Sequence, residues 1–154
     1  MIEERLQALG IELPAAPRPV ASYVPAVEAD ALLFISGQLP FRDGALLHTG
    51  RVPDPVAVHA AQEAARQCVI NALAVARDQL GTLGRVERVV RLSGYVASSP
   101  DFYQQPAVIN GASDLLEAIF GGAGKHSRIA VGVASLPLNA PVELDLIMQI
   151  TRAT

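Results

Sequence analysis

Apolar residues repeat along the chain with two different periods, which together predict a mixture of helices and strands. A helical period of about 3.6 residues runs from Asp54 to Leu80, with Asp54 as a suitable N-cap and Pro55 at the first helical position. Many apolar positions of this segment are alanines, so the predicted helix can lie close to a sheet. Shorter helical patterns predict two further helices, over 2–9 and 102–120.

Alternating or short apolar runs between turn residues predict the strands. The expected strands span 20–29, 31–37, 86–97, 128–134 and 142–151, and a shorter one spans 45–48. In the third of these, Val90, Leu92, Gly94 and Val96 are expected on one face. The order of elements favours an α+β fold, in which two helices pack on one face of a mixed sheet. The opposite face then needs a cover, which neighbouring subunits can provide.

Composition and charge narrow the classes of protein. The 154 residues, 51% hydrophobic and 18% charged, predict a single domain over 1–154, in which 1–19 form a helix and a proline-rich lead. The net charge of −3 and the lack of a Lys/Arg-rich run argue against nucleic acid as a partner. No segment approaches the roughly 20 apolar residues that span a bilayer. The single cysteine, Cys68, is compatible with a reducing cytoplasm, and its place on a helical apolar stripe predicts a packing role.

The most informative segment is the predicted strand that Arg128 opens. Side chains alternate between faces along a strand, so Arg128 shares a face with Ala130 and Gly132. Small neighbours leave room beside a permanent cation, whose planar guanidinium can bind a carboxylate through two hydrogen bonds. From this pattern two interpretations stay open, namely a site for the carboxylate of a small molecule, or a structural salt bridge from Arg128 to Glu143 or Asp145.

Several blocks of sequence, taken together, resemble a known family. The blocks are Tyr23-Val24-Pro25-Ala26-Val27, the stretch Leu33-Phe34-Ile35-Ser36-Gly37-Gln38-Leu39-Pro40, Asp101-Phe102, Asn110, and the run from Arg128 through Leu136-Pro137 to Glu143. In this order and spacing they resemble the Rid family, YjgF-like proteins named for reactive-intermediate deamination and also labelled endoribonuclease L-PSP. The long N-terminal lead and the form Gly-Lys-His-Ser-Arg-Ile-Ala-Val-Gly-Val are similar to a longer YjgF-like subgroup.

The resemblance implies a chorismate-mutase-like fold and a homotrimer with three clefts at the subunit interfaces. It also implies hydrolysis of imines and enamines derived from amino acids, without a metal or an organic cofactor. A small carboxylate is the expected substrate, and a membrane is not an expected partner.

By position, the resemblance implies roles for individual residues. Arg128 is expected to bind the substrate carboxylate, and Glu143 to act on water and on the imine nitrogen, so that these two are the candidate catalytic residues. A carboxylate that positions water and moves a proton is worth about 10²–10⁴-fold in rate. The other expected substrate-binding residues are Tyr23, Asn110, Ser36 and Gly37. His126 is expected either at the rim of the cleft or in a solvated loop.

Two other classes of function stay open. A ligand-binding or regulatory trimer would use the same cleft without turnover. The family label also suggests a ribonuclease, but such an enzyme needs several cations that face phosphate and usually a histidine acid–base pair. One arginine per expected cleft and an acidic isoelectric point near 5.5 make this class the least favoured.

Overall fold

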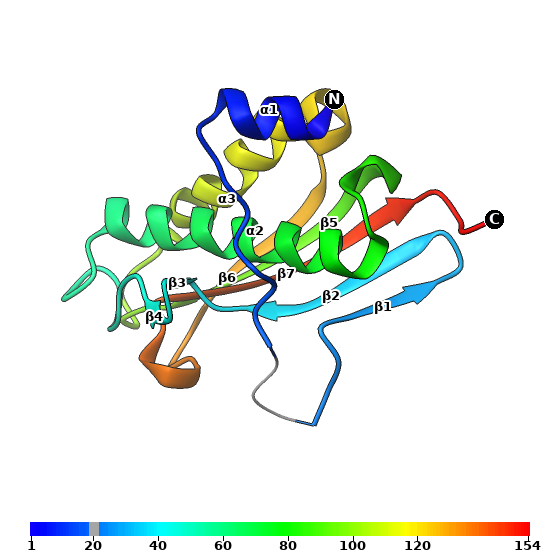
Figure 1. Cartoon of the computed structure of the whole chain (residues 1–154). Coiled ribbons are helices and arrows are strands. Elements are labelled where there is room, and N and C mark those ends of the chain that lie inside the picture. Colours follow the sequence, from blue (N-terminus) through cyan, green and yellow to red (C-terminus); the bar gives the residue numbers. More distant parts are fainter. Residues whose placement is uncertain (19–21) are drawn as a thin grey trace.

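In a computed structural model, which describes residues 1–18 and 22–154, five strands form one mixed sheet and two long helices cover one of its faces (Figure 1). The strand order is β1-β2-β7-β5-β6. The strands are β1 (Ala26–Ala29), β2 (Leu32–Gln38), β5 (Val86–Ala97), β6 (Ser127–Val133) and β7 (Val142–Ile150), and a separate hairpin joins β3 (Phe41–Arg42) to β4 (Ala45–Leu46). Strand β6 runs parallel to β5, while the other neighbouring strands are antiparallel.

Three α-helices form the second layer and its edge. They are α1 (Ile2–Ala8), α2 (Val58–Leu80) and α3 (Gln105–Phe120), and three short 3₁₀ helices are η1 (Leu83–Arg85), η2 (Gly121–Gly124) and η3 (Pro137–Asn139). Helix α2 contacts β2 and β7, and α3 contacts β5 and β6, so both cover the same face. Helix α1 packs against α3 and is tied to its end by Arg5, whose Nη1 donates to the Ile119 carbonyl oxygen at 2.9 Å.

The predicted fold class is confirmed, since this is an α+β protein with two helices on one face of a mixed sheet. The strand expected over 86–97 has these bounds in the structure. Strand β1 begins only at Ala26, and residues 20 and 21 of the strand expected over 20–29 lie outside the described residues.

The predicted start of the long helix is wrong. Helix α2 begins at Val58, and Ala57, not Asp54, is its N-cap. The segment before it is tied to the end of β5, because the Val52 amide donates to the Ala97 carbonyl oxygen at 2.8 Å. The chain must turn away from this strand before helix α2 can begin. Helix α3 likewise begins three residues later than expected, after a turn that buries Phe102.

One position of the predicted core is also wrong. The strand pairing shifts between Val89 and Arg91, which is a β-bulge. Val89 is therefore completely buried, whereas Val90, which the alternation placed with Leu92, is only half-buried.

The two faces of the sheet differ in their surroundings. Leu92 and Leu146, a cross-strand pair under the helices, are fully buried. The other face carries large apolar side chains that remain exposed, namely Val27, Phe34 and Ile129. An exposed apolar sheet face indicates an interaction surface.

The contact between α2 and α3 depends on a glycine. A Cβ atom at Gly111 would collide with the main-chain carbonyl of Gln62 in α2. A Gly-to-Ala change inside a helix normally stabilises it by about 1 kcal/mol, but overpacking against backbone costs about 1–3 kcal/mol. We therefore expect Gly111→Ala to lower the free energy of unfolding by roughly 1–3 kcal/mol in urea titrations.

Gly122 provides the matched control, because a Cβ there meets no atom within 4 Å. Gly122→Ala should change the free energy of unfolding by less than about 0.5 kcal/mol. A Gly111→Ala protein as stable as wild type would contradict the close helix contact.

Candidate functional site

Arg128 lies at the start of edge strand β6 and faces helix α3. Its Nη1 donates to Ser113 Oγ at 3.0 Å, and its Nη2 donates to the Pro106 carbonyl oxygen at 3.3 Å. Its cross-strand neighbour is the fully buried Leu92. Arg128 therefore lies on the helix-covered face, at the outer edge of the sheet.

Two further residues belong to the surroundings of Arg128. Asn110 lies four residues after Pro106 and three before Ser113, so the three share one side of α3. His126 is half-buried, with Nε2 at 2.9 Å from Ser113 Oγ and Nδ1 at 2.6 Å from the Gly124 carbonyl oxygen. His126 lies in the short loop before β6, but its ring is held by hydrogen bonds and is only partly solvated. We call Arg128, Asn110, Ser113 and His126 the arginine half-site.

The space expected beside Arg128 is partly filled. A Cβ at Gly132, on the same face, would lie 2.7 Å from both Gln105 Nε2 and Ser98 Oγ. These two side chains are hydrogen-bonded to each other at 3.2 Å. The glycine at this position is therefore explained by packing.

Glu143 lies near the start of β7, on the other face of the sheet. It pairs with Tyr95, and the next residue, Leu144, points into the helix-side core. A Cβ at Gly37 would collide with Glu143 Oε1, so the close approach of the carboxylate to β2 requires a glycine there.

The residues next to Gly37 complete this second group. Ser36 Oγ donates to the Val24 carbonyl oxygen at 2.7 Å and so holds the segment that carries the half-exposed Tyr23. A cavity of about 150 Å³ lies between Tyr23, Ser36 and Gly37, with Leu138 on its wall. We call Glu143, Gly37, Ser36 and Tyr23 the glutamate half-site.

Burial changes the acid–base properties of this face. The pKa of Glu143 is raised, mainly because the carboxylate is partly desolvated and secondly because Asp145 carries a like charge nearby. Burial also raises the pKa of Asp145, against the opposing effects of a hydrogen bond from Ser93 and the charge of Arg91. A carboxylate that binds its proton more readily than usual is suited to proton transfer.

Cys68 lies in the core behind this site. Complete burial, and secondly the charge of Glu143, raises the pKa of its thiol well above the usual value. A thiol in these surroundings is inert, as the predicted packing role requires.

The structure does not bring Arg128 and Glu143 together within one chain. They project from opposite faces, and among the described residues no hydrogen bond or ion pair joins Arg128 to Glu143 or Asp145. The predicted structural salt bridge is thus not found. One small ligand cannot contact both residues of the same chain.

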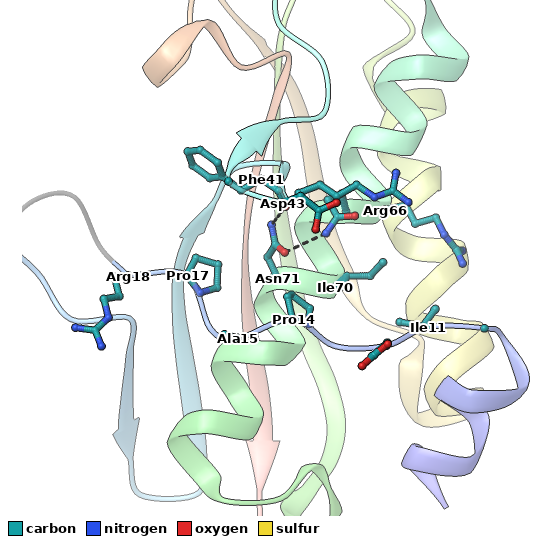
Figure 2. Close-up of a pocket in the computed structure, with 15 residues that line it drawn as sticks. Ile11, Pro14, Ala15, Pro17, Arg18, Phe41, Asp43, Arg66, Ile70 and Asn71 are labelled. Atoms are coloured by element: carbon teal, nitrogen blue, oxygen red, sulfur yellow. Dashed lines mark hydrogen bonds between the residues drawn. The ribbon is translucent and has the colours of Figure 1, made fainter.

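A cavity of about 670 Å³ is lined by none of the residues of the two half-sites (Figure 2). It lies between the N-terminal segment, the β3–β4 hairpin and α2, and Arg18 and Arg66 are among its lining residues. On one wall, Asn71 Nδ2 donates to the Leu39 and Phe41 carbonyl oxygens at 3.0 and 2.9 Å, which anchors the hairpin. Sequence reasoning missed this cavity because its residues come from three distant segments with no common spacing.

Two negative observations hold for residues 1–18 and 22–154. No helix there combines the length and the apolar character needed to cross a membrane. No group of three or more His, Cys, Asp and Glu side chains is arranged to hold a metal ion.

Comparisons with known proteins extend over nearly the whole chain. A family model described as "YjgF/chorismate_mutase-like, putative endoribonuclease" matches residues 3–150. The chain is 44% identical to protein TCP17 of Trypanosoma cruzi, over 97% of this chain and 94% of that protein. It is 28% identical to a 2-iminobutanoate/2-iminopropanoate deaminase of Dermatophagoides farinae, over 91% and 94% of the two chains.

A solved structure gives the same result for the fold. A protein of unknown function from Agrobacterium tumefaciens superposes with a TM-score of 0.91 at 48% identity, covering 97% of this chain and 92% of that one.

Proposed function

Because the chain belongs to the YjgF/chorismate mutase-like family, we propose that it hydrolyses imines and enamines derived from amino acids, at clefts between the subunits of a homotrimer. In each cleft the arginine half-site of one subunit meets the glutamate half-site of its neighbour. The proposal places this reaction in the cytoplasm, where a free thiol such as Cys68 stays reduced.

The observation that carries the proposal is the separation of Arg128 and Glu143 onto opposite faces of one chain. Each half-site holds only part of the chemistry that the reaction needs. A head-to-tail ring places one subunit's arginine half-site against the next subunit's glutamate half-site, and it repeats this pairing at every interface. The exposed apolar side chains Val27, Phe34 and Ile129 support such an assembly, because an interface would cover them.

Arg128 is suited to bind the carboxylate of a 2-iminoacid. Of the five N–H donors of a guanidinium, two are used by Ser113 and Pro106, and three remain for a ligand. Two of these can bind a carboxylate as a planar fork. Asn110, on the same side of α3, adds an amide that can donate to or accept from the ligand.

Glu143 supplies the acid–base step. Its carboxylate takes one proton from the water that attacks the imine carbon and gives it to the nitrogen, which forms a carbinolamine. It then takes the second proton from the carbinolamine hydroxyl and gives it to the nitrogen as the C–N bond breaks, so that ammonia leaves. The products are ammonia and a 2-oxoacid, so atoms and charge balance. The raised pKa of Glu143 suits both transfers. The deaminase name of one relative supports this reaction class.

We expect Arg128→Ala to lose binding of 2-oxoacids such as pyruvate, measured by calorimetry. Each lost hydrogen bond to a charged group costs about 1.5–3 kcal/mol. Arg128→Lys should also bind poorly, because an ammonium lacks the planar fork. The melting temperature should change little, since Arg128 is only half-buried. Wild-type affinity in Arg128→Ala, or a large fall in melting temperature, would assign the arginine a structural role.

Glu143→Gln separates an enzyme from a ligand-binding trimer. In a coupled assay, an amino-acid oxidase generates 2-iminoacids and the release of ammonia or 2-oxoacid is followed. Turnover should fall about 10²–10⁴-fold, while 2-oxoacid binding stays unchanged or tightens because a like charge is removed.

Glu87→Gln provides the control, because it removes a carboxylate near the start of β5, far along the strand from Tyr95, which pairs with Glu143. This variant should keep wild-type turnover. A wild-type protein that binds 2-oxoacids but does not accelerate hydrolysis of aliphatic, aromatic or acidic iminoacids would instead support the ligand-binding trimer.

A further inference from the structure

A chain of hydrogen bonds leads from the backbone at Gly124 to the guanidinium of Arg128. His126 Nδ1 lies 2.6 Å from the Gly124 carbonyl oxygen, and a carbonyl only accepts, so this nitrogen carries the hydrogen. In the neutral ring Nε2 is then an acceptor, and Ser113 Oγ, at 2.9 Å, donates to it. The same serine oxygen accepts from Arg128 Nη1 at 3.0 Å.

The direction of each bond follows from the one before it. A serine hydroxyl normally rotates to suit its surroundings. Here its hydrogen is committed to His126, so the oxygen lone pairs are left for Arg128. The other contact of the guanidinium, with the Pro106 carbonyl oxygen, is longer at 3.3 Å. Ser113 therefore makes the shorter of the two contacts that orient Arg128.

We propose that Ser113 and His126 are positioning residues that hold Arg128 ready for the carboxylate of the ligand. The proposal rests on the proposed function in one respect, namely that Arg128 binds a carboxylate. A long side chain loses conformational freedom when a ligand orders it, and a side chain fixed in advance avoids most of this loss. Neither Ser113 nor His126 needs to contact the ligand for this effect.

The neighbouring strand residue offers a matched control. Ser127 Oγ donates to the Val90 carbonyl oxygen at 3.0 Å, outside the bonds that link His126, Ser113 and Arg128. Ser127→Ala thus removes one hydrogen bond from a hydroxyl to a carbonyl next to Arg128, and it leaves the orientation of the Arg128 side chain unchanged. Ser113→Thr is the conservative variant, because it keeps a hydroxyl on the same Cβ.

The first experiment titrates each variant with 2-oxobutanoate in a calorimeter. Ser113→Ala should bind about tenfold more weakly, which corresponds to about 1.4 kcal/mol. Ser113→Thr should restore affinity to within about twofold, a change below 0.5 kcal/mol, and Ser127→Ala should match wild type. Equal affinity in Ser113→Ala and wild type, or equal losses in Ser113→Ala and Ser127→Ala, would overturn the proposal.

The second experiment does not depend on any ligand. Nitrogen NMR at mildly alkaline pH, where a free imidazole is neutral, should show the His126 hydrogen on Nδ1. The Arg128 Nη–H signal, assigned by its loss in Arg128→Ala, should be protected from exchange in wild type, where Nη1 donates to Ser113, and lose this protection in Ser113→Ala.

The two experiments separate the two proposals. If wild type does not bind 2-oxobutanoate, carboxylate binding by Arg128 fails, and the NMR measurement alone decides the positioning role. An Arg128 signal that is the same in wild type and Ser113→Ala, or a hydrogen on Nε2 of His126, overturns that role. Loss of protection confined to Ser113→Ala supports it.

Discussion

The alternation of side chains along paired strands is the constraint that fixes where the candidate functional groups of this protein lie. Strand β5 links the two candidate residues, because Leu92 pairs with Arg128 on β6 and Tyr95 pairs with Glu143 on β7. Leu92 belongs to the helix-side core, whereas Tyr95 projects from the opposite face. The register therefore directs the cation and the carboxylate away from each other. A site that uses both must include a second copy of the chain.

The helix layer contributes as much to the arginine half-site as the sheet does. Gly94 allows Ile109 of α3 to lie directly on β5, since a Cβ at that glycine would meet the isoleucine at 2.6 Å. This close packing brings Ser113 and the Pro106 carbonyl within hydrogen-bonding distance of Arg128. The glutamate half-site depends on close approach in the same way, at Gly37. Glycines at these contacts thus set where the functional groups lie.

Periodicity in the sequence predicted the elements well where local pattern decides them. The bounds of β5 and the C-terminal ends of α2 and α3 were correct, because hydrophobic spacing and the following glycines mark them. The start of α2 was missed, because it depends on how Val52 is tied to β5, a contact between distant segments. The bulge at Val89 was also missed, because it depends on how β5 pairs with β7, a strand distant in the sequence.

For the site, the sequence motifs pointed to Arg128 and Glu143. The alternation along a strand predicted which side chains of that one strand lie on the same face. Alternation cannot relate the faces of two strands without their register, so the separation of the two residues was not foreseen. Ser113 lay outside the blocks that carry the family resemblance. Its role became visible only through the packing of α3 over β6.

The central claim is that one cleft uses Arg128 of one subunit and Glu143 of its neighbour. Subunits of Arg128→Ala and Glu143→Gln, each inactive by itself, can be unfolded together in equal amounts, refolded and assayed for iminoacid hydrolysis. In a head-to-tail trimer with random mixing, about a quarter of the clefts combine an intact arginine with an intact glutamate. We therefore expect recovery of about a quarter of wild-type turnover in particles of trimer mass. Mixed trimers without any recovered activity would contradict it.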